Sequence, residues 1–129
     1  TRIRHELWVK LLGNVALNPT SVLTGSTIAR MLENEEVLAL TRSMMEEVVA
    51  VAFKLGLELP ISVDQRIAGA QKVGEHKTSM LQDFEKGRPM ELEAVVGAVV
   101  EIARRLEVPI PCTETVYSCA KLLAERSHA

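Results

Sequence analysis

The sequence predicts an all-α fold, a bundle of about six helices in a single domain of residues 1–129. Three observations carry this prediction. Apolar residues recur every three or four positions along most of the chain. Hydrophobic residues make up 47% of the chain and aromatic residues only 3%, so Leu, Val, Ile, Ala and Met must build the core, which favours helix over sheet. No run alternates with period two between hairpin turns.

Three helical segments are expected in the first half of the chain. They cover residues 3–17, 27–31 and 35–55. The first should end before Pro19, because the residue that precedes a proline avoids the helical region. The third has an N-cap candidate in Asn34, and Gly56 supplies its C-terminal stop.

Four more helices are expected in the second half. They cover residues 63–73, 80–85, 90–106 and 113–125. Ser62 is the cap candidate of the first, Thr78 and Ser79 are the candidates for the second, and Thr113 is the candidate for the last. Gly97 lies inside the apolar helix 90–106, where glycine costs about 1 kcal/mol relative to alanine, so we expect a close helix–helix approach there.

A polar stripe runs along the otherwise apolar first helix, in the stretch WVKLLGNVALNPTS. Lys10, Asn14 and Asn18 are four residues apart, so they lie on nearly one helix face. We expect the helix to be buried around this stripe, which must then face a neighbouring polar helix, a water-filled cleft or a ligand, because a buried lysine or asparagine needs polar partners. It fits hydrogen bonding to another helix, with Asn18 acting locally at the Asn-Pro step. It also fits a ligand cleft in which Lys10 donates a proton or stabilises an oxyanion.

A second polar constellation covers residues 76–93. Ser79 opens a short helix and offers a hydroxyl to an anion such as a carboxylate, although a plain N-cap explains it equally well. Asp83 fits a structural pair with Lys86 or Arg88.

Two glutamates end this constellation, in the first turn of the helix 90–106. Acidic residues are ordinary partners of the helix dipole at that position. Of the two, Glu91 lies at the edge of the apolar face and is expected to point inward, unlike Glu93.

Several functional classes are excluded by what the sequence lacks. The net charge is −2 with both signs mixed, which does not indicate nucleic-acid binding, and charges interrupt every apolar run before a membrane span is complete. No nucleotide-binding glycine motif is present, and the histidines lack metal-ligand spacing. Cys112 and Cys119 are too far apart on one helix for a disulfide. We expect buried or half-buried free thiols, no metal site, no signal peptide and a cytoplasmic protein.

Three motifs together resemble the C-terminal domain of the ketopantoate reductase (2-dehydropantoate 2-reductase) family. They are W-x-K-L-x-x-N-x-x-x-N-P at 8–19, H-K-T-S-M-L-Q-D-x-x-x-G-R-P-x-E-x-E at 76–93 and VPIP at 108–111. The resemblance covers nearly the whole chain. It implies the helical fold found in the C-terminal domains of 6-phosphogluconate-dehydrogenase-type reductases.

The resemblance also implies roles for the polar residues. Lys10 matches the catalytic lysine, which gives a proton to the ketone oxygen as hydride arrives from NADPH. Glu91 matches the acid that binds the substrate hydroxyl and helps to hold the catalytic arrangement. Ser79 matches the hydroxyl that binds the substrate carboxylate. Asn14 and Asn18 match asparagines that contact the substrate and orient Lys10.

Members of this family have a second, N-terminal Rossmann domain that binds NADPH, and this chain resembles only the helical domain. The expected substrate is therefore a 2-oxo acid, ketopantoate. The expected partners are the Rossmann domain and, in a homodimer, a second copy. We expect the chain by itself to be inactive. The alternatives are a related reductase of another 2-oxo acid, or a stand-alone helical module for dimerisation or interaction.

Overall fold

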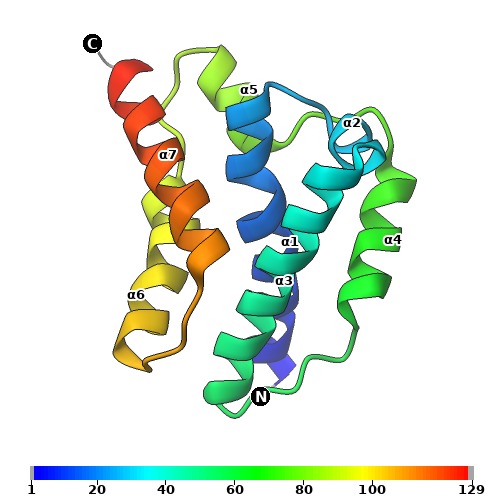
Figure 1. The fold of residues 1–129 in the computed structure, drawn as a ribbon, viewed down its shortest axis with the longest axis vertical. Coiled ribbons are helices and arrows are strands. Elements are labelled where there is room, and N and C mark those ends of the chain that lie inside the picture. The colour runs from blue at the N-terminus through cyan, green and yellow to red at the C-terminus, as the bar shows by residue number, and fades with distance from the viewer. Residues whose placement is uncertain (1, 128–129) are drawn as a thin grey trace.

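The computed structural model describes residues 2–127, and every regular element in that range is helical (Figure 1). The elements are α1 (Arg2–Thr24), α2 (Ile28–Glu33), α3 (Glu35–Lys54), α4 (Val63–Val73), α5 (Ser79–Glu85), the π-helical turn η1 (Glu93–Gly97), α6 (Ala98–Arg105) and α7 (Pro111–Ser127). The all-α prediction is confirmed. Residues 1 and 128–129 lie outside the described part, and with them one of the three histidines.

Helix α1 is the centre of the bundle. It passes behind α3, with α6 and α7 on one side and α4 on the other, and α5 lies near its C-terminal end (Figure 1). Leu12, Val15 and Ala16 of α1 are completely buried, as are Met44 and Val48 of α3. As the composition predicts, aliphatic side chains and methionines form most of this core.

The predicted N-caps are confirmed at α3, α4 and α5, whereas the cap of α2, Thr27, was not predicted. The side chains of Thr27, Asn34, Ser62 and Thr78 accept backbone N–H groups at the N-termini of α2, α3, α4 and α5. Ser62 also forms a capping box with Gln65. Because these bonds join residues two or three positions apart, the sequence alone could locate them.

Pro19 does not end the first helix, as the sequence analysis expected. Helix α1 continues to Thr24, and Pro19 is buried within it. The hydroxyl of Thr20 donates to the carbonyl of Ala16 at 2.9 Å, and that of Ser21 donates to the carbonyl of Asn18 at 2.7 Å. Proline removes one helical hydrogen bond. Burial of residues 19–22 against the rest of the bundle outweighs that loss.

Helix α7 begins at Pro111, two residues before the expected cap at Thr113. The cap is instead the carboxylate of Glu47 on α3, which accepts the backbone N–H groups of Cys112 and Thr113 at 3.0 and 2.8 Å. The Thr113 hydroxyl donates to the same carboxylate at 2.6 Å. A residue 66 positions away in the chain thus replaces the local cap. Local sequence signals could not reveal it.

The two cysteines are free, as expected, but only Cys112 is partly buried, while Cys119 is exposed. Burial, followed by the negative charge of Glu47 and a hydrogen bond to it, raises the pKa of the Cys112 thiol.

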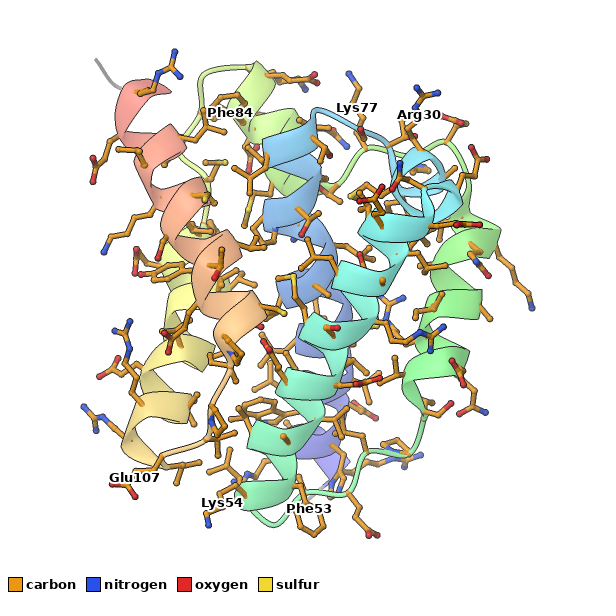
Figure 2. The ribbon with its side chains drawn as sticks, viewed as in Figure 1. Arg30, Phe53, Lys54, Lys77, Phe84 and Glu107 are labelled. Atoms are coloured by element: carbon orange, nitrogen blue, oxygen red, sulfur yellow. The ribbon has the colours of Figure 1, made fainter. Side chains whose placement is uncertain are left out.

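The outer surface of the bundle carries mixed charges. Arg30, Lys54, Lys77 and Glu107 project away from helix ends and loops (Figure 2). No helix within residues 2–127 is both long and apolar enough to cross a membrane.

Candidate functional site

One cavity of about 410 Å³ brings together all five polar residues that the sequence analysis singled out. It lies between α1, α5 and the segment that enters η1. Its polar lining comprises Lys10, Asn14, Asn18, Ser79, Asp83 and Glu91, and its apolar lining comprises Leu7, Leu11, Met80, Ala94 and Val95.

The polar stripe of α1 forms one side of this cavity. Lys10, Asn14 and Asn18 all reach it, so the spacing of four residues does place them on one face. Of the surroundings expected for the stripe, a cleft agrees with the structure, but the expected burial of Lys10 is wrong. Lys10 is exposed, and the two asparagines are half-buried. The stripe borders an open cavity rather than a neighbouring helix, and solvent therefore reaches the lysine.

Helix α5 supplies the second wall. Its cap is Thr78, whose side chain accepts the N–H of Leu81 at 3.1 Å. This leaves the neighbouring Ser79 hydroxyl exposed at the cavity. Of the two cap candidates, only Thr78 caps the helix, and Ser79 faces the cavity.

A buried pair of hydroxyls fastens α5 to α1. The oxygens of Ser21 and Thr78 are 2.6 Å apart, and both residues are buried. Since the single hydroxyl hydrogen of Ser21 points to the carbonyl of Asn18, Thr78 is the donor in this pair. Ser21 therefore links the cavity stripe to the wall that carries Ser79.

Asp83 also lines the cavity, although the sequence analysis assigned it only a structural pair. Its carboxylate lies 3.3 Å from Nε of Arg88, so the predicted pairing with Arg88 is confirmed. Because Arg88 balances this charge, Lys10 and Glu91 are the charged groups at the cavity that have no ion-pair partner among residues 2–127.

The third wall begins at Glu91, which directly precedes the helical residues. Glu91 is exposed and lines the cavity with Ala94 and Val95. The sequence analysis expected one regular helix over 90–106. Instead the segment opens with the π-helical turn η1, in which the N–H of Ala98 bonds the carbonyl of Glu93, five residues back.

On its other side this turn is hydrogen-bonded to α7 through Glu93 and Tyr117, a pair that the sequence analysis did not predict. The hydroxyl of Tyr117 donates to the Glu93 carboxylate, with Oε2 and Oε1 at 2.6 and 2.7 Å. This hydrogen bond, then burial and the negative charge of Glu93, raises the pKa of Tyr117 to about 12. A Cβ atom at Gly97 would lie only 3.2 Å from the hydroxyl oxygen of Tyr117 on α7. This confirms the expected close approach of two helices at Gly97.

The cavity is suited to a small polar ligand with an apolar portion. Within residues 2–127, the side chains of Lys10, Asn14, Asn18, Ser79 and Glu91 form no hydrogen bond or ion pair with other protein groups. Their donors and acceptors are therefore available to a ligand. No group of acidic, histidine or cysteine side chains in the described range could hold a metal ion.

Comparison with known proteins matches the same region of the chain. A family model described as "Ketopantoate reductase PanE/ApbA C terminal" matches residues 2–124. The chain belongs to the ketopantoate reductase family. It is 52% identical over 122 residues to the 2-dehydropantoate 2-reductase of Mesorhizobium japonicum, covering 95% of this chain and 37% of that protein.

Solved structures of ketopantoate reductases share the fold. The 2-dehydropantoate 2-reductase of Methylococcus capsulatus has a TM-score of 0.92 at 40% identity, covering 98% of this chain and 44% of that one. The dimeric ketopantoate reductase of Staphylococcus aureus has a TM-score of 0.82 at 28% identity, covering 97% of this chain and 44% of that one. The chain thus spans about two fifths of the length of these relatives.

Proposed function

We propose that this chain is the substrate-binding and catalytic C-terminal domain of an NADPH-dependent 2-dehydropantoate 2-reductase. The reaction is the reduction of ketopantoate to pantoate in pantothenate and coenzyme A biosynthesis. The observation that carries the proposal is the convergence of five otherwise unpartnered polar side chains on one cavity. The relatives named above support the choice of substrate.

Lys10 is the proposed proton donor. Reduction of a ketone puts negative charge on the carbonyl oxygen, and an ammonium beside that oxygen stabilises the charge and supplies the proton. The Lys10 side chain has no competing partner among the described residues. Glu91 supplies an acceptor for the substrate hydroxyl in the same cavity and helps to hold the catalytic arrangement.

The remaining polar residues orient the substrate. Ser79 offers its exposed hydroxyl to the substrate carboxylate, while Asn14 and Asn18 contact the substrate and orient Lys10. The apolar lining, which includes Leu11, Met80 and Val95, receives the aliphatic part of the molecule.

NADPH supplies the hydride, and the residues of this chain do not form its main binding site. Within residues 2–127 there is no strand, and the sequence has no glycine-rich dinucleotide motif. We therefore propose that an N-terminal Rossmann domain outside these residues binds most of the cofactor, and that the chain by itself is inactive. A cytoplasmic homodimer completes the proposal, and the dimeric Staphylococcus aureus neighbour supports the assembly.

The test is ketopantoate-dependent oxidation of NADPH by the longer protein that carries this chain. Lys10→Ala should lower kcat by at least ~100-fold, the range expected for loss of general acid catalysis. The matched control is Lys54→Ala, which removes an exposed lysine that points away from the bundle (Figure 2). Full activity in the Lys10 variant would refute its catalytic role. An inactive wild-type protein would favour the interaction module instead.

A further inference from the structure

The contact between Tyr117 and Glu93 lies outside the cavity, on the α7 side of η1. Tyr117 is buried, and its hydroxyl reaches the carboxylate of Glu93 at 2.6 Å. The cavity side of the same segment carries Glu91, Ala94 and Val95. The π-helical turn therefore has α7 on one side and the proposed substrate on the other.

Gly97 allows this contact to form. A Cβ atom at Gly97 would lie 2.5 Å from Oε2 of Glu93 and 3.2 Å from the hydroxyl oxygen of Tyr117. Any side chain there would displace the carboxylate. The glycine, the carboxylate and the phenol thus form one unit, which we call the Tyr117 lock (Glu93, Gly97 and Tyr117).

The π-helical turn determines the direction of the residues before it. It contains one residue more per turn than the α-helix that follows, and the bond from Ala98 to Glu93 marks this extra residue. If the turn relaxed to α-helix, the preceding residues would rotate by roughly 100° about the helix axis. Glu91 would then leave the cavity.

We propose that Tyr117 is a positioning residue that holds the π-helical turn through Glu93 and thereby keeps Glu91 directed into the cavity. This inference rests on the proposed function for its catalytic consequence. Its structural part, the stability of the bond between Ala98 and Glu93, does not depend on that function. Short π-helical turns occur often at functional sites, which agrees with a positioning role.

The first measurement is hydrogen exchange at the Ala98 amide in the whole protein. Tyr117→Phe removes only the donating hydroxyl and should raise the exchange rate at Ala98 by about tenfold, because a hydrogen bond to a charged group is lost. Ser118→Ala is the matched control, since among the described residues the exposed Ser118 hydroxyl bonds only the carbonyl of Glu114. An unchanged Ala98 rate in Tyr117→Phe would overturn the proposal. This measurement is valid whether or not the protein reduces ketopantoate.

The second measurement is a double-mutant cycle on kcat/KM with Glu91→Ala. Tyr117→Phe should lower kcat/KM by about tenfold in the wild-type background, but by less than about twofold when Glu91 is absent, because both changes remove the same interaction. An equal loss in both backgrounds would show that Tyr117 does not act through Glu91. Wild-type protein without activity would refute the proposed function and leave the exchange result to decide the structural part.

A conservative variant of Glu93 completes the design. Glu93→Gln keeps an oxygen that accepts the Tyr117 hydrogen, so kcat/KM should stay within about twofold of wild type. A loss as large as that of Tyr117→Phe would overturn the assignment of this hydrogen bond as the contact that positions Glu91.

Discussion

The α5 wall of the cavity is anchored by a hydroxyl pair inside the protein, whereas the η1 wall is anchored by a phenol–carboxylate pair near the surface. Thr78 and Ser21 are both buried, and Thr78 also caps its own helix. In the other wall Tyr117 is buried but Glu93 is exposed. If the hydroxyl pair is broken, its buried groups have no water to replace the lost partner. If the phenol–carboxylate pair is broken, water can hydrate the exposed Glu93 carboxylate. The first anchor should therefore contribute more to stability, and the second should affect mainly the local geometry.

The largest effect is expected for Thr78→Ala. It removes a helix cap and a buried hydrogen bond together, and should lower the free energy of unfolding by about 2 kcal/mol. Thr78→Ser retains the hydroxyl and is the control. Urea unfolding followed by circular dichroism measures both. Equal losses in the two variants would assign the effect to the methyl group rather than to the hydroxyl.

A smaller loss is expected for Tyr117→Phe, about 1 kcal/mol in the same measurement. The Glu93 carboxylate is exposed and regains water when the phenol hydroxyl is removed. A loss as large as that of Thr78→Ala would contradict the difference between the two walls.

Gly97→Ala should change stability by less than about 0.5 kcal/mol, because two effects oppose each other. Alanine gains about 1 kcal/mol of helix propensity, but its Cβ atom displaces the Glu93 carboxylate. Gly69→Ala on α4 is the matched control, since nothing lies within 4 Å of its added Cβ atom, and it should be stabilising. Equal stabilisation of both variants would show that the Tyr117 lock contributes no stability.

The smallest effect at neutral pH is the titration of Tyr117. Its pKa in the folded protein is about 12, above the ordinary value of about 10, so folding favours the protonated phenol. The resulting stabilisation is complete below pH ~10 and is lost as the pH rises toward 12. Because the chain has one tyrosine, ultraviolet absorbance of residues 1–129 reports it directly. An ordinary pKa would contradict the hydrogen bond to Glu93.

The polar residues of the site were predictable from the sequence, whereas their surroundings were not. Helical spacing placed Lys10, Asn14 and Asn18 on one face, and the family motifs drew attention to Ser79 and Glu91. The apolar neighbours predicted a buried lysine and left three possible surroundings for the stripe, and only the arrangement of α1, α5 and η1 shows that the stripe faces an open cavity. The catalytic roles remain a proposal that the Lys10 variant tests.

The all-α class, most helix boundaries and three of the N-caps were predictable from the sequence, since those features depend on residues within a few positions of each other. Three features were not predictable from the sequence: α1 continues through Pro19, Glu47 caps α7, and η1 is a π-helical turn. Each of these depends on packing or on hydrogen bonds between distant segments, such as Glu93 and Tyr117, which are 24 residues apart. Local helix propensity contains no information about such distant partners, and burial in the assembled bundle outweighs local propensity.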